Sequence, residues 1–193
     1  EVEVIADGTA NPDFIAADFL SQAEHGADSQ AMLVTSAESI VSPVVDAIQQ
    51  QLSELSRRDI TAKALEHSRI IVLKDEQEVI AFTNMYAPEH LIIQTENYAH
   101  IAEQIENAGS VFMGPYTPES AGDYASGTNH TLPTNGYAKA YSGVNLDSFI
   151  KKITFQEITA EGIKNLGGTI QTMAGNEQLD AHRNAVTIRL KTI

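Results

Sequence analysis

Five short apolar, β-branched runs, separated by longer helix-periodic segments, limit the fold of this sequence more than any other feature. In a parallel sheet both faces of each strand are covered, so its strands read as continuous apolar runs joined by helical crossovers. The pattern predicts an α/β fold with a layered parallel sheet, similar to an incomplete Rossmann domain. The expected strands are Val2–Ala6, Ala31–Thr35, Arg69–Leu73, Leu91–Thr95 and Ser110–Gly114.

Helix signals fill the segments between these runs. Asn11, Pro12 and Asp13 form an N-cap, a first-turn proline and a first-turn acid, and they predict a helix that continues to about His25. A second helix is expected over about residues 36–57, with a kink or break at Pro43. Two further helices are expected at about 75–86 and 97–107, the latter ending before a glycine.

The pattern changes after Pro133. Residues 137–142 could add one more strand, and short helices are expected around Phe149, over 159–173 and over 177–185. We therefore expect an α/β portion at 1–143 and a small, mainly helical C-terminal appendage at 144–193.

Composition excludes several classes of protein. The net charge of −14 argues against a nucleic-acid partner, which would need a basic face. No apolar run approaches the length of a membrane span, so a cytoplasmic protein without a membrane partner is expected. Because the chain has no cysteine, any metal must be held by nitrogen and oxygen ligands.

Candidate site residues occur in four places. The long polar segment 119–133 holds Asp123 and His130, and a loop of this length in a compact domain is often functional. Gln22 and His25 are three residues apart near the end of the first helix, so they share one face. The pair could be metal or substrate ligands, or a hydrogen-bonded helix end.

The other two places are less distinctive. Glu89 and His90 precede a strand and could serve as a general base pair, although ligands usually bind at the opposite, carboxyl ends of parallel strands. Glu177 and His182 are expected in the last helix, where they could equally be surface residues. From spacing alone, a solvated turn and a helix surface remain the simpler interpretations of these two pairs.

Four segments, taken together and in order, strongly resemble histidinol dehydrogenase. The resemblance covers the whole chain and rests on 21–26 (SQAEHG), 87–91 (APEHL), 119–133 (ESAGDYASGTNHTLP) and 181–187 (AHRNAVT). The family oxidises L-histidinol to L-histidine in two NAD-dependent steps, and its members are homodimers with shared active sites. The resemblance implies that Gln22, His25, Asp123 and His182 bind zinc.

The resemblance also implies the remaining roles. Glu89 would activate water at the aldehyde stage, His90 would take the alcohol proton, and His130 and Glu177 would contact substrate. The zinc ligands and His90 would contact it too. His182 and Glu177 would act in the partner subunit, because the family's C-terminal segment reaches into the other active site.

Family members are more than twice as long as this chain, so the resemblance implies a C-terminal portion without most NAD contacts. No glycine-rich dinucleotide fingerprint occurs in the sequence, and no cofactor-binding residue is expected in it. The isolated chain is therefore expected to have little or no dehydrogenase activity. Two other functions remain open: a zinc-dependent hydrolase and a non-catalytic dimerisation module.

Overall fold

A computed structural model describes all residues, 1–193. The chain forms two compact units, Glu1–Phe149 and Ile150–Ile193, and each is described by itself. No helix in either unit is both long and apolar enough to cross a membrane.

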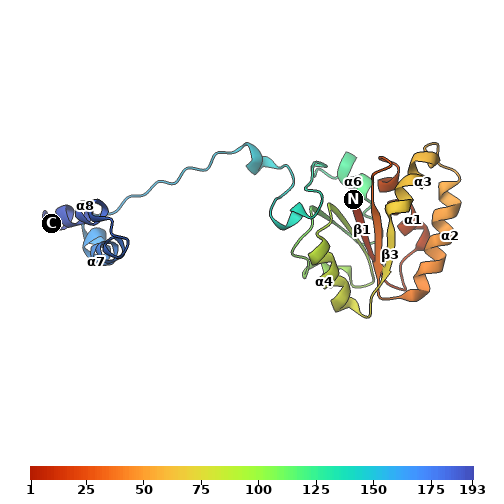
Figure 1. The fold of residues 1–193 in the computed structure, drawn as a ribbon, viewed down its shortest axis with the longest axis horizontal. Coiled ribbons are helices and arrows are strands. Elements are labelled where there is room, and N and C mark those ends of the chain that lie inside the picture. Colours follow the sequence, from red (N-terminus) through yellow and green to blue (C-terminus); the bar gives the residue numbers. More distant parts are fainter. The chain divides into compact units, whose positions relative to one another are not determined.

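The first unit is built on a five-stranded parallel sheet, which confirms the predicted α/β class (Figure 1). The strand order is β3-β2-β1-β4-β5, so the chain starts in the centre, builds one side and then crosses to the other. Val2 pairs with Ala31 on β2 and with His90 on β4, which aligns the amino ends of the central strands. The strands are β1 Val2–Ala6, β2 Ala31–Thr35, β3 Arg69–Val72, β4 His90–Gln94 and β5 Ser110–Met113.

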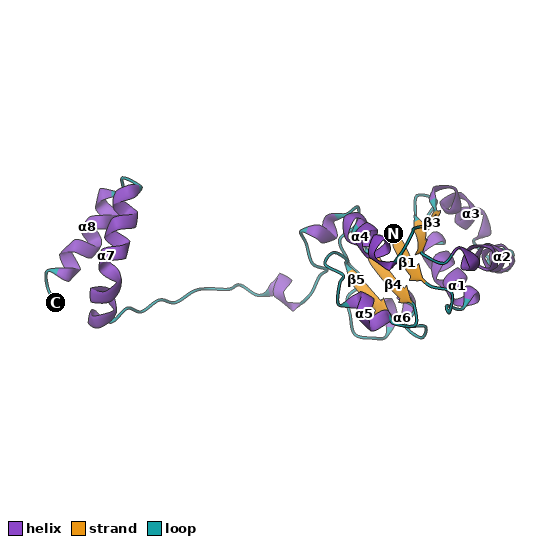
Figure 2. Cartoon of the chain, turned by 90° about the horizontal axis from the view of Figure 1, so that it is seen from below, coloured by secondary structure: helices purple, strands orange, loops and turns teal.

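Helices cover both faces of the sheet (Figure 2). On one face α1 (Pro12–Ala23) and α2 (Val41–Leu52) pack against β1 and β2 through residues such as Ile15 and Val44. On the other face α4 (Glu76–Tyr86) and α5 (Tyr98–Ala102) pack through residues such as Val79 and Ile101. The central strands are buried on both sides, which is why they read as unbroken apolar runs.

Several predicted helix boundaries need correction. Instead of one helix over 36–57, a 3-10 turn at Glu38–Ile40 leads into α2, and a separate helix, α3 (Arg58–His67), follows. Pro43 lies in the first turn of α2, where its missing N–H has no intrahelical acceptor to lose. α5 is shorter than the predicted 97–107.

Two expectations for the segment after β5 were wrong. Part of the expected loop 119–133 is helical, because α6 spans Glu119–Tyr124. Residues 137–142 form no strand: Tyr137–Lys139 is a 3-10 turn, and no sheet edge pairs with it. A further 3-10 turn, at Leu146–Phe149, ends the first unit.

The second unit contains two helices, α7 (Ala160–Asn176) and α8 (Asp180–Leu190), in line with the predicted helical appendage. Thr159 caps α7 by accepting a hydrogen bond from the amide of Gly162. Gly167 lets the helices approach closely, because a Cβ there would lie 2.7 Å from a methyl group of Leu190. Glu177 is the C-cap of α7, so the prediction that it lies in the last helix was wrong.

A carboxyl group inside the core makes stability depend on pH. Glu3 on β1 is fully buried and accepts a hydrogen bond from the hydroxyl of Thr83. Burial raises its pKa from 4.5 to about 7, against the opposing effect of that hydrogen bond. The folded chain therefore holds a proton here that the unfolded chain releases. The contribution of Glu3 to the free energy of unfolding is fully present below about pH 4.5 and is lost as pH rises through about 7.

We expect Glu3→Gln to remove this loss. The neutral amide has the same shape, so the free energy of unfolding of the variant relative to the native chain should rise by about 2–3 kcal/mol between about pH 5 and pH 8. Urea unfolding at both pH values measures the difference. Glu54→Gln, at an exposed position, is the matched control. A difference that stays constant with pH would show that Glu3 ionises as readily in the folded chain as in the unfolded one.

Candidate functional site

Glu89 and His90 are held at the amino edge of the sheet by the turn that joins α4 to β4. Ala87 ends α4 in the left-handed conformation, with φ 58°, and its amide donates to the carbonyl of Thr83 at 2.7 Å. Pro88 then prevents the helix from continuing. His90 is the first residue of β4, and its amide donates to the carbonyl of Glu1 at 3.2 Å.

Gly109 fixes the backbone of Glu89 from the neighbouring chain segment. Its amide donates to Pro88 at 2.9 Å, and the amide of Ser110 donates to the carbonyl of Glu89 at the same distance. A Cβ on Gly109 would lie 2.5 Å from that carbonyl oxygen, so only glycine fits here.

Helix α1 brings Gln22 and His25 to the same edge. The connection from β1 runs back along the sheet, so the end of α1 returns to the amino ends of the strands. Gln22 is buried on α1, whereas His25 follows the helix and is exposed.

Helix α6 brings two carboxyl groups to the same edge of the sheet. Glu119 and Asp123 are four residues apart, so they lie on one face of the helix. Gly122 packs against the ring of Phe112 on β5, where a Cβ would lie 2.6 Å from a ring atom. Glu119 is only 2 % exposed, although it carries a carboxyl group.

Together these elements form one cavity of about 280 Å³. It brings together six of the residues that the sequence singled out, together with Glu119, which the sequence did not indicate. The cavity is lined by Gln22, His25, Glu89, His90, Glu119, Asp123 and His130. Glu177 and His182 belong to the second unit, where both are exposed.

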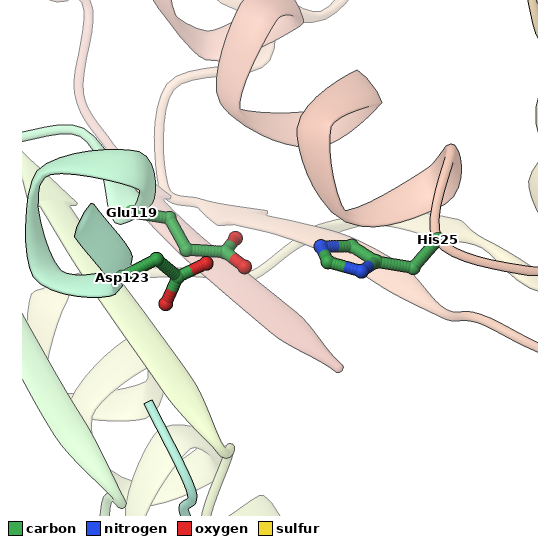
Figure 3. Close-up of side chains that lie close together, drawn as sticks. All are labelled: His25, Glu119 and Asp123. Carbon is green, nitrogen blue, oxygen red and sulfur yellow. The ribbon is translucent and has the colours of Figure 1, made fainter. Parts of the chain in front are cut away.

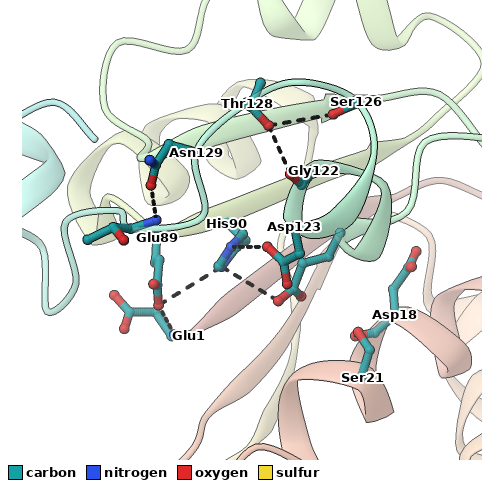
Figure 4. A network of polar contacts seen from close by, with 12 residues as sticks. Glu1, Asp18, Ser21, Glu89, His90, Gly122, Asp123, Ser126, Thr128 and Asn129 are labelled. Carbon is teal, nitrogen blue, oxygen red and sulfur yellow. Dashed lines mark hydrogen bonds and ion pairs between the residues drawn. The ribbon is translucent and has the colours of Figure 1, made fainter. Parts of the chain in front are cut away.

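His90 lies at the centre of the polar contacts in this cavity (Figure 4). Its Nδ1 lies 3.9 Å from Oε2 of Glu89 and 3.8 Å from Oε1 of Glu119, and its Nε2 lies 3.9 Å from Oδ1 of Asp123. Neither ring nitrogen has a hydrogen-bond partner, and both are buried. The ring packs against Phe112 with 5.9 Å between centroids.

Burial and charge set the protonation of these groups. Burial lowers the pKa of His90, although the carboxylates of Glu89 and Asp123 partly oppose this. The imidazole is therefore neutral near pH 7 and able to accept a proton. Burial, and next the charge of Asp123, raise the pKa of Glu119 to about 8.

Three side chains in the cavity are arranged as a cation site could require. One ligand atom each of His25, Glu119 and Asp123 lies within 4.8 Å of the others, and Figure 3 shows the two carboxylates and the imidazole facing one another. No lysine or arginine lines the cavity. Nitrogen and oxygen donors of this kind suit zinc.

The sequence does not single out Glu119, because the segment 119–133 reads as a loop. Its spacing of four from Asp123 was the available signal, since on a helix that spacing places two side chains on one face. This spacing could be interpreted only once the segment was known to be helical.

Comparisons with known proteins agree on one family. The histidinol dehydrogenase family model matches residues 1–190. The histidinol dehydrogenases of Bacteroides thetaiotaomicron and Vibrio parahaemolyticus are 65 % and 55 % identical over all 193 residues. A crystal structure of histidinol dehydrogenase from Elizabethkingia anophelis superposes with a TM-score of 0.94 at 59 % identity, over 99 % of this chain and 44 % of that one.

The chain spans 45 % of the length of these two curated relatives. The match covers all 193 residues of the chain and so includes the segments that form the cavity. The chain therefore belongs to the histidinol dehydrogenase family.

Proposed function

We propose that this chain is the C-terminal portion of a zinc-dependent, cytoplasmic histidinol dehydrogenase of histidine biosynthesis. The whole enzyme would oxidise L-histidinol to L-histidine through the aldehyde, using two NAD. One observation carries the proposal: candidate residues from three segments that lie far apart in the sequence line a single cavity. A cavity lined by carboxyl groups and imidazoles, without lysine or arginine, also suits a metal ion and a substrate that carries an amine and an imidazole.

The metal would be held by Gln22, His25 and Asp123 of this chain and by His182 of the partner subunit. His25 and Asp123 lie in the cluster described above, and Gln22 lines the same cavity. When bound, zinc would position the substrate through its amine and imidazole.

Two residues would perform the proton transfers. His90, neutral because burial lowers its pKa, would take the proton of the substrate hydroxyl. Glu89 would activate the water that attacks the aldehyde stage. The two are adjacent in sequence but belong to different steps, and His130 and Glu177 would contact the substrate.

The residues of this chain do not fit a dinucleotide site. The turn after β1 reads Asp7-Gly8-Thr9-Ala10-Asn11 and lacks the glycine spacing that lets a pyrophosphate approach the backbone. We therefore assign the NAD contacts mostly to parts of the enzyme outside this chain.

The proposed enzyme is a homodimer with a shared active site. Residues 1–143 would carry most of the zinc and catalytic residues. Residues 144–193 would form the segment exchanged between subunits, which would bring His182 and Glu177 of the partner subunit to the cavity.

The isolated chain should produce no NADH from histidinol. A full-length chimera, in which the chain replaces the matching segment of the Bacteroides thetaiotaomicron enzyme, should produce two NADH per histidinol. Absorbance of NADH and the yield of histidine measure both. NADH formation by the isolated chain would contradict the assignment of the NAD contacts, and an inactive, folded chimera would contradict the proposed function. NADH formation that depends on histidinol would exclude a hydrolase, which would turn over without a nicotinamide.

A further inference from the structure

Glu119 is a buried carboxyl group that stability does not explain. It is 2 % exposed, and its Oε2 is buried without a hydrogen-bond partner. Burying a carboxyl group without satisfying its oxygens costs free energy, and an apolar side chain of similar volume would avoid that cost. An acid at this position therefore needs another reason.

The surroundings of Glu119 connect it to His90. Its Oε1 lies 3.8 Å from Nδ1 of His90, which is the shortest of the three distances between that ring and a carboxylate. Glu89 also faces Nδ1, but its side chain is 16 % exposed, against 3 % for Glu119. Asp123 faces the other ring nitrogen, Nε2.

The packing around this pair is tight. α6 approaches β5 through Gly122, whose Cα side lies against the ring of Phe112, and that ring packs on His90. The imidazole is thus held by an apolar contact on one side and faces Glu119 through Nδ1. A neutral imidazole donates from one nitrogen and accepts at the other, so the partner of Nδ1 decides what Nε2 can do.

We propose that Glu119 is a positioning residue for His90: an oxygen of its carboxyl group accepts the hydrogen of Nδ1, which leaves Nε2, on the side of Asp123, free to take the proton of the reacting hydroxyl. This inference rests on the proposed function, in which His90 takes the hydroxyl proton. The distance of 3.8 Å is longer than a hydrogen bond, and such contacts often tighten only when substrate is bound. A base oriented by a third group is a common arrangement in active sites.

The test is a double-variant cycle in the full-length chimera. Glu119→Leu removes the polar contact at similar volume, and Glu119→Gln keeps an acceptor oxygen. We expect Glu119→Leu to lower kcat for histidinol about 10- to 100-fold, the usual effect of losing an orienting partner, with KM changed less than about 2-fold. Glu119→Gln should recover most of that loss. In a His90→Gln background, Glu119→Leu should cost nothing further.

Zinc content separates this role from its closest rival. Glu119 lies in the cluster with His25 and Asp123, so it could instead be a metal ligand. A positioning residue predicts that Glu119→Leu keeps the zinc content of the unsubstituted chimera. Loss of zinc in this variant would overturn the proposal, and so would an equal loss of kcat in the native and His90→Gln backgrounds.

If His90→Gln leaves kcat unchanged, the role given to His90 in the proposed function is refuted. The contact between Glu119 and His90 can still be tested in the isolated chain. The ring-nitrogen NMR signals of His90, assigned by their absence in His90→Gln, should shift in Glu119→Leu. They should not shift in Glu103→Leu, an exposed control. Unshifted signals in a folded Glu119→Leu chain would overturn the proposed contact.

Discussion

In the full-length chimera, Glu89→Gln should slow the oxidation of the aldehyde to histidine by about 100- to 10,000-fold, the range that general base catalysis usually contributes. The glutamine keeps the shape of the side chain but cannot accept a proton from water. Substrate binding should change little, because the proposed metal site and its ligands remain. The alcohol step should also proceed, since His90 takes that proton.

Rates measured separately with histidinol and with its aldehyde test this expectation. Glu96→Gln is the matched control, because Glu96 lies just beyond the opposite end of β4 and does not line the cavity. Equal slowing of both steps would assign Glu89 to binding or structure rather than to water activation. Unchanged rates of both steps would leave the non-catalytic interpretation in place.

Asp123→Ala should lower the affinity of the isolated chain for zinc by more than about 100-fold. Loss of a residue that only hydrogen-bonds to a metal ligand typically lowers metal affinity about 10- to 100-fold, and Asp123 is a proposed ligand itself. It is also the carboxylate that faces both the cluster and Nε2 of His90. Titration with zinc, followed by calorimetry, measures the affinity, and native mass spectrometry counts ions and subunits.

The native chain should appear in that spectrum as a dimer with two zinc ions. Asp46→Ala, an exposed aspartate on α2, should bind zinc as the native chain does. A native chain that binds no zinc would mean that these residues do not assemble a metal site by themselves. Zinc binding that survives Asp123→Ala would exclude Asp123 as a ligand.

Local signals accounted for much of the fold. The apolar runs located all five strands within one residue, because strands that are covered on both faces leave an unbroken hydrophobic signal. Asn11 and Pro12 located the start of α1, since the N-cap hydrogen bond to Asp13 is made within the segment itself. The helix expected over 159–173 corresponds to α7, which Thr159 caps.

Local signals failed where the outcome depended on neighbours. The aromatic and small residues of 137–142 resemble a strand, but a strand forms only where it pairs with another, and no further strand joins the sheet beyond β3 or β5. The segment 119–133 looked like a loop because it is polar and contains glycine. Gly122 is instead the point at which α6 packs on Phe112.

The same distinction applies to the residues of the site. The sequence by itself determined which residue types were available and, through a family resemblance, which of them to select: Gln22, His25, Glu89, His90, Asp123 and His130. Only the tertiary structure decided that they meet at the amino edge of the sheet and that Glu119 joins them. Spacing along a chain determines which side chains share a helix face, whereas the distance between His90 on β4 and Glu119 on α6 depends on strand order and on how α6 packs across β5.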